Sequence, residues 1–434
     1  MTAQTAEDLW EAWPGLSDDE RVAAFRALSS DVREDFFESL DPREQAALLR
    51  TLPSAEHRLW LRSLAPDDAA DLLGEVSPEE QATLLGLLDD TTRTEVRALL
   101  AYAEDEAGGL MNPRFARIRP AMTVAEAIPY LKRQAPHVET IYYAYVLDEQ
   151  QRLLGVLSFR ELFQASEQRI VRDIMHPDPV TVSEYLDQEA VGRIYVDEDL
   201  LALPVVDGEG RMKGIITFDD IADVVRREAT EDIQKVGGTE ALGLPYLTVG
   251  LTALVKKRAG WLAALFLGEM LTATAMSAYQ GEIAQAVVLA LFVPLIISSG
   301  GNSGSQATTL VIRAMALGEV RLRDWWRVLR REVIAGIILG VVLGAIGLTR
   351  ILVWQGVGHM YGAHYFLLAL TVACSLVGVV LWGSLAGSML PFLLRRVGLD
   401  PASASAPLVA TLVDVSGLMI YFGVAKIFLT GTLL

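Results

Sequence analysis

The sequence predicts a multidomain membrane protein: an α-helical superhelical N domain, a tandem α/β pair and a five-helix transmembrane domain. A twelve-residue repeat over residues 16–90 predicts the helical part. A block within residues 111–230 that is built twice predicts the α/β pair. Long apolar segments after residue 258 predict the membrane domain.

Composition divides the 434 residues into two chemically different parts. Residues 1–255 carry 48 acidic against 24 basic side chains, whereas residues 256–434 carry 7 against 13. The excess negative charge of the first part argues against a nucleic-acid partner and is compatible with binding cations. The single cysteine, Cys374, supports neither a disulfide framework nor a thiolate metal site. The first residues lack a basic start with an apolar stretch, so we expect no cleavable signal peptide.

The repeat places an apolar residue at every twelfth position. Its members are Leu16, Leu28, Leu40, Leu52, Leu64, Val76 and Leu88. Capping residues, prolines and acids follow, as in residues 40–44 (Leu-Asp-Pro-Arg-Glu), and these signal helix starts. Helices of about two turns cannot bury their apolar faces alone, so we expect them to stack into a superhelix. Its acidic rim is a candidate source of cation ligands; the simpler interpretation is a structural scaffold.

The duplicated block contains two β-hairpins, each followed by a short helix. The hairpins are formed by residues 143–148 with 154–159 and by residues 204–207 with 213–218. Upstream, residues 110–113 (Leu-Met-Asn-Pro) are echoed by residues 174–177 (Ile-Met-His-Pro). This organisation resembles a tandem pair of cystathionine-β-synthase-type (CBS) modules, which usually form a paired regulatory unit.

Within this resemblance, Thr217 and Asp220 are similar to the ribose contact of nucleotide-binding members. They are therefore the candidate residues for binding ATP. The simpler role for one of the two acids Asp219 and Asp220 is that of a helix N-cap.

Acidic residues are concentrated where the second module ends. They are Asp220, Asp223, Glu228, Glu231 and Asp232. Their spacings of three and four would gather them on one side of a helix, where like charges repel by roughly a few tenths of a kcal/mol per pair. A divalent cation would relieve this repulsion, and Mg2+ prefers one or two carboxylates plus retained water. The pattern predicts a regulatory Mg2+ site; the alternative is a solvated charged face.

Five apolar segments are each close to the ~20 residues needed to cross a hydrocarbon core. They are residues 259–279, 283–299, 333–354, 364–390 and 407–429. Basic residues precede the first segment and follow the second and fourth, whereas the other two loops contain none. By the positive-inside rule, we expect a multi-pass inner-membrane protein with its amino terminus in the cytoplasm and its carboxyl terminus outside.

Two stretches differ from plain hydrophobic anchors. Residues 298–306, including Asn302, turn the inner end of the second segment into small and polar residues, which permits irregular backbone beside a water-filled path. One helical face of the last segment carries Ala406, Ala410, Asp414 and Gly417. An intramembrane carboxylate costs at least ~2.5 kcal/mol and normally faces a pathway or partner. Asp414 is therefore the candidate ion-selecting residue, whereas Glu269 is expected to hydrogen-bond between helices.

Together these motifs resemble the MgtE family of magnesium channels over nearly the whole chain. The resemblance is carried by residues 300–308, 228–233, 389–396 and 407–417. It implies a homodimer whose pore is lined by the second and fifth spans of both chains. The implied pore residues are Asp414, Ala410, Gly417 and Asn302, with Asp414 at the family's pore aspartate that holds a hydrated Mg2+. The implied regulatory acids are Asp199, Asp220, Asp223, Glu228, Glu231 and Asp232, with Glu189 beside them.

One position departs from the family. Ala406 stands where the family often has asparagine, so one donor or acceptor for the hydrated ion is missing. The implied domains are a cytosolic helical-repeat N domain (1–108), CBS modules (109–170 and 171–232), a connecting plug helix (233–258) and a transmembrane domain (259–434).

The predicted function is a Mg2+-selective channel or transporter gated by cytosolic Mg2+. An alternative is an ion-coupled secondary carrier for divalent cations such as Mg2+ or Co2+, with Asp414 as the coupling group. A membrane-anchored nucleotide sensor that does not conduct is disfavoured by Asp414 and by the polar end of the second span. No nucleophile–base arrangement or phosphate loop indicates an enzyme.

Overall fold

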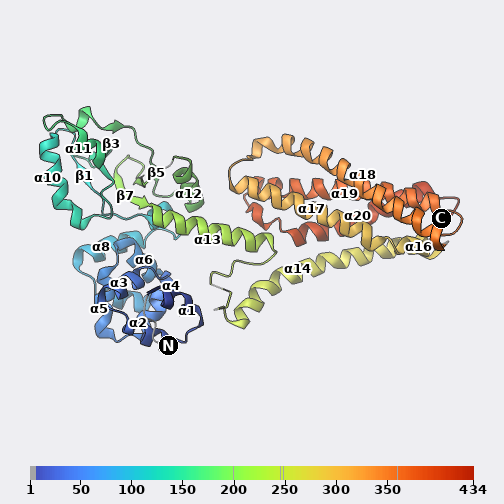
Figure 1. Ribbon diagram of the computed structural model, residues 1–434, viewed down its shortest axis with the longest axis horizontal. Coiled ribbons are helices and arrows are strands. Elements are labelled where there is room, and N and C mark those ends of the chain that lie inside the picture. Colours follow the sequence, from blue (N-terminus) through green and yellow to red (C-terminus); the bar gives the residue numbers. More distant parts are fainter. Residues whose placement is uncertain (1–5, 199, 245, 248, 359) are drawn as a thin grey trace. The chain divides into compact units, whose positions relative to one another are not determined.

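The computed structural model describes residues 6–198, 200–244, 246–247, 249–358 and 360–434. The chain divides into two compact units, Met1–Arg227 and Glu228–Leu434 (Figure 1). The first unit combines helices with two small sheets, and the regular elements in the described part of the second unit are helices.

The first unit begins with short helices that follow the repeat. They are α1 (Ala6–Ala12), α2 (Asp18–Ala27), α3 (Ser30–Glu38), α4 (Pro42–Thr51), α5 (Ser54–Ser63), α6 (Pro66–Gly74), α7 (Pro78–Leu85) and α8 (Asp90–Leu99), with the 3-10 turn η1 (Trp13–Gly15). Each helix packs mainly on the helix two places along the chain, so even-numbered and odd-numbered helices form two rows. The predicted helical-repeat fold is confirmed.

The repeat residue marks the end of a helix and enters the core. Leu28, Leu52 and Leu64 each follow directly on the last helical residue and are buried. The next helix starts directly afterwards because an N-cap residue follows. At the start of α4, the Asp41 carboxylate accepts a hydrogen bond from the Arg43 backbone N–H at 3.0 Å. One residue type therefore sets both the helix length and the packing of the superhelix.

The middle of the chain forms two α/β modules, as predicted. The first contains β1 (Arg117–Ile118), α10 (Val124–Gln134), β2 (Tyr143–Leu147), β3 (Leu153–Ser158) and α11 (Phe159–Gln164), with β4 (His176–Pro177) at its edge. The second contains β5 (Val182–Ser183), α12 (Gln188–Asp197), β6 (Ala202–Val206), β7 (Met212–Thr217) and the start of α13 (Phe218–Val236). In each sheet, a parallel pair is followed by an antiparallel hairpin.

The echoed Met-containing segments exchange partners between the modules. Asn112, which precedes the first module, pairs with Ile215 in β7 of the second. His176, which precedes the second module, pairs with β3 of the first. Glycine is needed at both crossings: a Cβ on Gly155 or on Gly214 would lie 2.7 Å from the facing carbonyl oxygen, that of His176 or Asn112. The repeated Met-containing segments therefore each pair with a strand of the other module, and this exchange holds the two modules together.

In its described part, the second unit contains five stretches long and apolar enough to cross a membrane. They are Leu251–Ala278, Val287–Ala316, Leu322–Gly358, Tyr365–Arg396 and Ala406–Leu429. The corresponding helices are α14 (Leu251–Ala278), α17 (Val293–Ala316), α18 (Trp325–Gly358), α19 (Tyr365–Arg396) and α20 (Ala406–Leu429) (Figure 1). Short helices α15 (Gln280–Gln285) and α16 (Val287–Ala290) join α14 to α17, η4 (Leu322–Asp324) precedes α18, and η5 (Pro401–Ser403) precedes α20.

Two local expectations differ from the structure. The polar stretch of residues 298–306 was expected to permit irregular backbone, but it lies inside the regular helix α17. The irregular backbone lies upstream, at Ala286 (φ −128°, ψ 72°). Residues 233–258, expected as one connecting helix, contain instead the end of α13, a non-helical stretch with Gly238 at φ +74°, and the start of α14. The glycine ends α13 because it adopts the left-handed conformation.

Close helix packing through glycine organises the membrane domain. A Cβ on Gly383 would lie 2.2 Å from the carbonyl oxygen of Gly300, and one on Gly387 would lie 2.1 Å from that of Gly304. These two pairs, each spaced by four residues, bring the backbones of α17 and α19 into direct contact. The Thr308 hydroxyl then donates to the Gly387 carbonyl at 2.8 Å.

We predict that Gly383→Ala destabilises the folded bundle by roughly 1–3 kcal/mol, because the added methyl group must push two backbones apart. Gly423→Ala is the matched control, since a Cβ there meets nothing within 4 Å. Thermal unfolding of the purified chain in detergent measures both. Equal melting temperatures for the two variants would contradict the close-packing argument.

Candidate functional site

A buried acidic contact forms where the N domain meets the CBS pair. Asp67 and Asp68 at the start of α6 lie close to Asp220 at the start of α13, and Glu139 of the first module lies beside them. The side chain of Asp67 is 7 % exposed. The contact lies within the first unit, so segments far apart in sequence meet there.

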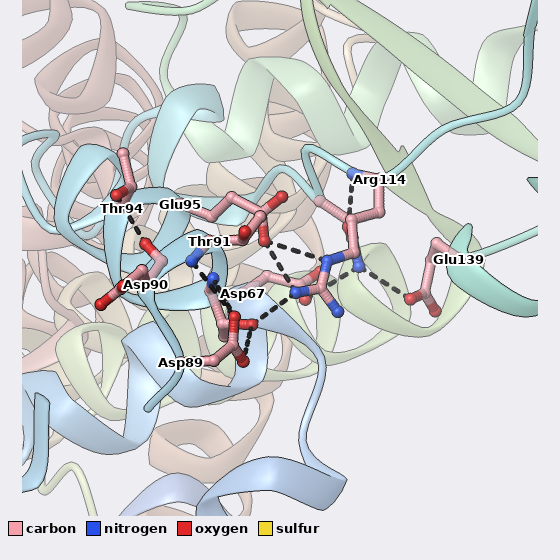
Figure 2. Close-up of polar contacts among 10 residues, drawn as sticks. Asp67, Asp89, Asp90, Thr91, Thr94, Glu95, Arg114 and Glu139 are labelled. Atoms are coloured by element: carbon pink, nitrogen blue, oxygen red, sulfur yellow. Dashed lines mark hydrogen bonds and ion pairs between the residues drawn. The ribbon is translucent and has the colours of Figure 1, made fainter. Parts of the chain in front are cut away.

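Asn112 joins the two sides of this contact. Its side-chain amide donates to Asp67 Oδ1 at 3.0 Å and to Glu139 Oε2 at 2.7 Å. Both of these acids are labelled in Figure 2. Its own Oδ1 accepts from the Arg114 backbone N–H at 2.8 Å, and the side chain is fully buried. The Arg114 guanidinium is directed to Glu95, with Nη2 2.8 Å from Oε2. Asn112 thus joins an acid of the N domain to an acid of the first CBS module through neutral donors.

The carboxyl groups of this contact resist ionisation. Burial, reinforced by the neighbouring Asp219, raises the pKa of Asp220 to about 8. Burial, reinforced by Asp71, raises the pKa of Asp68 to about 7. Burial raises the pKa of Asp71 to about 6 against the opposing charge of Arg227, and burial also raises the pKa of Asp67 well above its usual range. Removal of these carboxylates from water is the largest cause of each pKa shift, and neighbouring acids add to it.

The acidic contact is not arranged for direct coordination of a metal ion. Among the described residues, no group of three or more His, Cys, Asp or Glu side chains is arranged to hold a metal ion directly. Mg2+ commonly keeps several water molecules and binds through one or two carboxylates. The residues that would hold it are Asp67, Asp68, Asp220 and Glu139.

Local ion pairs are common among the other predicted regulatory acids. Three of them pair with a base on their own helix: Asp223 with Arg226 at 3.0 Å, Glu231 with Lys235 at 2.5 Å and Glu189 with Arg193 at 2.5 Å. Glu228 and Asp232 lie half-buried in the second unit. Asp199 lies outside the described residues. Local ion pairs are typical of a solvated charged face, the alternative considered from the sequence.

Thr217 and Asp220, the candidate nucleotide residues, bind each other. The Thr217 backbone N–H donates to Asp220 Oδ2 at 3.0 Å, and the same oxygen lies 2.8 Å from the Thr217 hydroxyl. The pair therefore caps the start of α13, which is the simpler role foreseen for Asp220. The hydrogen bonds from Thr217 also fix the position of the Asp220 carboxyl group in the acidic contact.

In the membrane domain, Asp414 lies on α20, half-buried, within hydrogen-bonding reach of the Glu269 carboxyl group on α14. Glu269 thus lies between two helices, as expected from the sequence. Two carboxyl groups side by side in an apolar bundle repel when both are charged, so a cation between them would be favoured.

The other candidate pore residues separate onto two faces. Ala410 lies against Gly301 of α17, where an added Cβ would be 3.6 Å from the Ala410 Cα atom. Asn302 is exposed on the opposite side of α17 from its buried neighbours. Gly417, expected on the pore face, is buried within the single chain beside Val379 and Ile297. Its place at the pore stays a prediction.

Ala406 contacts the second span through its backbone. Its carbonyl oxygen accepts a hydrogen bond from the Ser305 hydroxyl of α17 at 3.2 Å. This bond does not use the side chain of residue 406, so it does not replace the asparagine side chain.

Within the second unit, the last turn of α13 is held firmly. Lys235 Nζ lies 2.6 Å from Asp400 and 2.5 Å from Glu231. Burial opposes the charge of Lys235, but the hydrogen bonds to these two carboxylates raise its pKa. Val236 packs beside Ile312 and Ala402, at the ends of the membrane helices. Asp400 belongs to the short loop between α19 and α20, so this contact lies directly before the span that carries Asp414.

The fold and these sites define a class: a multi-span membrane protein for cations with a CBS-containing regulatory part. Family models match over most of the length: MgtE, described as divalent cation transporter, over residues 293–424, the MgtE intracellular N domain over 4–105, and the CBS domain over 107–168 and 171–227.

Curated relatives agree with these matches. The chain is 47 % identical over 343 residues to the magnesium transporter MgtE of Thermus thermophilus, covering 79 % of this chain and 74 % of the relative. It is 33 % identical to the protein of the same name from Enterococcus faecalis, covering 77 % and 72 %. A solved structure of the cytosolic domain of the Mg2+ channel MgtE in complex with ATP is similar, with 44 % identity, a TM-score of 0.49 and coverage of 51 % of this chain and 91 % of that one. The chain belongs to the MgtE family, which is a transporter family and not a family of enzymes.

We predict that without Mg2+ the acidic contact weakens as pH rises. A carboxyl group with a raised pKa favours the folded contact while protonated, so its contribution is complete near pH 4 and is lost as pH rises through its folded pKa. The relevant values are about 6, 7 and 8 for Asp71, Asp68 and Asp220. Hydrogen exchange of the α6 amides, corrected for intrinsic rate, should therefore accelerate between pH 6 and pH 8.

Added Mg2+ should restore the slow exchange at pH 8. The double variant Asp68→Asn/Asp220→Asn, which keeps size and removes charge, should show little pH dependence. Exchange that is unchanged by pH and by Mg2+ in the unmodified chain would exclude a charge-dependent contact.

Proposed function

We propose that this chain is a Mg2+ channel or transporter of the cell membrane whose flux is controlled by cytosolic Mg2+. The observation that carries the proposal is Asp414, an intramembrane carboxylate within the region that matches the divalent cation transporter model. The relatives' name, magnesium transporter, supports Mg2+ as the transported ion, and other divalent cations such as Co2+ share the same ligand chemistry.

The ion path is proposed to form between two copies of the chain. The exposed side of α17 carries Asn302 and Gln306, and Asp414 is only half-buried within one copy. Two Asp414 carboxylates around one water-lined path would attract a divalent ion and hold it through its waters, because Mg2+ releases water reluctantly. Carbonyl oxygens near Ala410 are suited to complete the ring. Homodimerisation therefore belongs to this proposal.

Control by cytosolic Mg2+ is proposed to act through the acidic contact of Asp67, Asp68, Asp220 and Glu139. Without cations, the buried charges oppose the approach of the N domain to the CBS pair. Bound Mg2+ supplies the positive charge that the contact lacks. The exposed acids of α13 and α12, Asp223, Glu231 and Glu189, contribute less because each is paired with a nearby base.

The proposed topology places the acidic first unit in the cytoplasm and the carboxyl terminus outside. Arginines are concentrated in the α17–α18 and α19–α20 connections, and an odd number of spans separates the two ends. ATP binding at the CBS pair is a separate prediction, for which Thr217 would need to release Asp220.

We predict that Asp414→Asn lowers Mg2+ flux at least about tenfold, since losing ~1.4 kcal/mol of ion binding has that effect. Flux through the purified chain in liposomes, read with an internal Mg2+ dye, measures it. Glu332→Gln is the control, because it removes an acid from α18 instead. Normal Mg2+ flux and ion discrimination in a well-folded Asp414→Asn protein would exclude the pore assignment. Uptake driven by an imposed H+ or Na+ gradient would favour the coupled carrier.

We further predict that Asp68→Asn/Asp220→Asn flattens the response of flux to cytosolic Mg2+, because little repulsion remains for the cation to relieve. The same liposome assay, with Mg2+ varied on the cytosolic side, measures the response. Asp223→Asn is the control, since that side chain is exposed and paired with Arg226. If Asp223→Asn flattens the response and the double variant does not, the exposed side of α13 is the regulatory site.

A further inference from the structure

An arginine-lined cavity lies between the end of α17 and the start of α18. Its volume is about 440 Å³, and Arg321, Arg323, Arg327 and Arg331 line it. Neither the Mg2+ path nor the acidic contact uses these side chains. The cavity lies wholly within the second unit.

The cavity is built on ordered backbone. Gly318 ends the α17 side of the turn at φ +71°, and the Val320 N–H donates to the Ala314 carbonyl at 3.0 Å. Asp324 then accepts from the Arg321 backbone N–H at 3.1 Å and from Arg327 Nη1 at 2.7 Å. Val320 and Val328, which also line the cavity, pack beside Phe392 of α19. The arginines are therefore held on the helix bundle rather than on a loose loop.

The charge of this cavity is not balanced within the chain. Arg323, Arg327 and Arg331 follow one another at four-residue spacing, so like charges face one another along the start of α18. The lining contains two acids, Glu319 and Asp324, and Asp324 is already engaged by Arg327. In the part of the chain that the structure describes, Arg321 and Arg323 form no ion pair, and Arg331 is attracted to the neighbouring Glu332 without forming one. An anion would satisfy them, and guanidinium groups bind phosphate oxygens in a bidentate manner.

The surroundings of the cavity are apolar and aromatic. Leu322, Trp325 and Trp326 are 41 %, 49 % and 59 % exposed, and the two indole rings lie 5.5 Å apart. Tryptophan at the end of a membrane helix typically occupies the headgroup level, with its ring against lipid and its N–H toward water. The same short segment therefore presents apolar rings and arginines side by side, which matches a phospholipid rather than a soluble anion.

We propose that this cavity binds the headgroup phosphate of an anionic membrane phospholipid, with the acyl chains against Leu322, Trp325 and Trp326. Basic pockets at the cytoplasmic ends of membrane helices are suited to such headgroups. The bound phosphate neutralises the repulsion at the start of α18 and joins it to the end of α17. The site is independent of Mg2+ transport, so its test does not depend on the proposed function.

The test titrates phosphatidylglycerol into the delipidated full-length chain in neutral detergent and counts bound lipid by native mass spectrometry. Arg323→Gln/Arg331→Gln should weaken binding about tenfold or more, because each base near a membrane surface contributes ~1 kcal/mol. Arg327 is left in place since it holds Asp324. Arg323→Lys/Arg331→Lys, which keeps the charge but removes the guanidinium fork, should bind with intermediate affinity and serves if the first variant folds poorly.

The control is Arg395→Gln/Arg396→Gln, which removes the same charge from the other basic connection, outside the cavity lining. It should bind phosphatidylglycerol like the unmodified chain. Equal weakening in both double variants would show diffuse attraction and overturn the site. Equally tight binding of phosphatidylcholine would remove the anionic requirement. Displacement of the lipid by inorganic phosphate at a similar concentration would make this a soluble-anion site, which also overturns the proposal.

Discussion

Both candidate sites rest on one constraint: a carboxylate removed from water needs a compensating positive charge. In the acidic contact, Asp67, Asp68 and Asp220 are brought together with Asn112 as the joining donor, where a lysine or arginine would have neutralised them. In the membrane, Asp414 faces another acid, Glu269. A permanent internal base would stabilise either site and leave nothing for a cation to do. Their charge imbalance is therefore the property that makes cation sensing and cation transport physically possible.

Close packing of the membrane helices holds the Asp414 site in place. Gly300 and Gly304 meet Gly383 and Gly387 so closely that α17 and α19 form a rigid pair against which α20 is held. In contrast, the apolar window of α14 contains no fully buried residue. Glu269 is thus carried by the least enclosed span and Asp414 by an enclosed one. A rigid face opposite a less enclosed helix suits a site whose occupant must enter and leave.

Local patterns in the sequence predicted local structure well. The twelve-residue repeat predicted where helices start, because a capping residue such as Asp41 acts on the first turn of the helix that follows it. The hairpins of the CBS modules follow from the alternation of apolar and polar residues and from turn residues. The buried acidic contact could not be predicted in this way, since Asp67 and Asn112 are 45 residues apart and meet only in the folded unit. The one available signal was the echo of Met-Asn-Pro and Met-His-Pro, which pointed to a special role for Asn112.

The helix α13 begins in the first unit and ends in the second. Its 19 residues span about 28 Å at 1.5 Å per residue. Its first turn, capped by Thr217 and Asp220, takes part in the acidic contact of the first unit. Its last turn is fixed within the second unit by Lys235 and Asp400, and the segment after it turns at Gly238 onto Trp261 of α14. Because an intact helix resists compression, a change in charge at Asp220 can reach Asp400 only as a displacement or rotation of the whole element. The proposed control by Mg2+ therefore requires α13 to stay helical across the boundary between the two units, and a break within it would uncouple sensing from transport while leaving both sites intact.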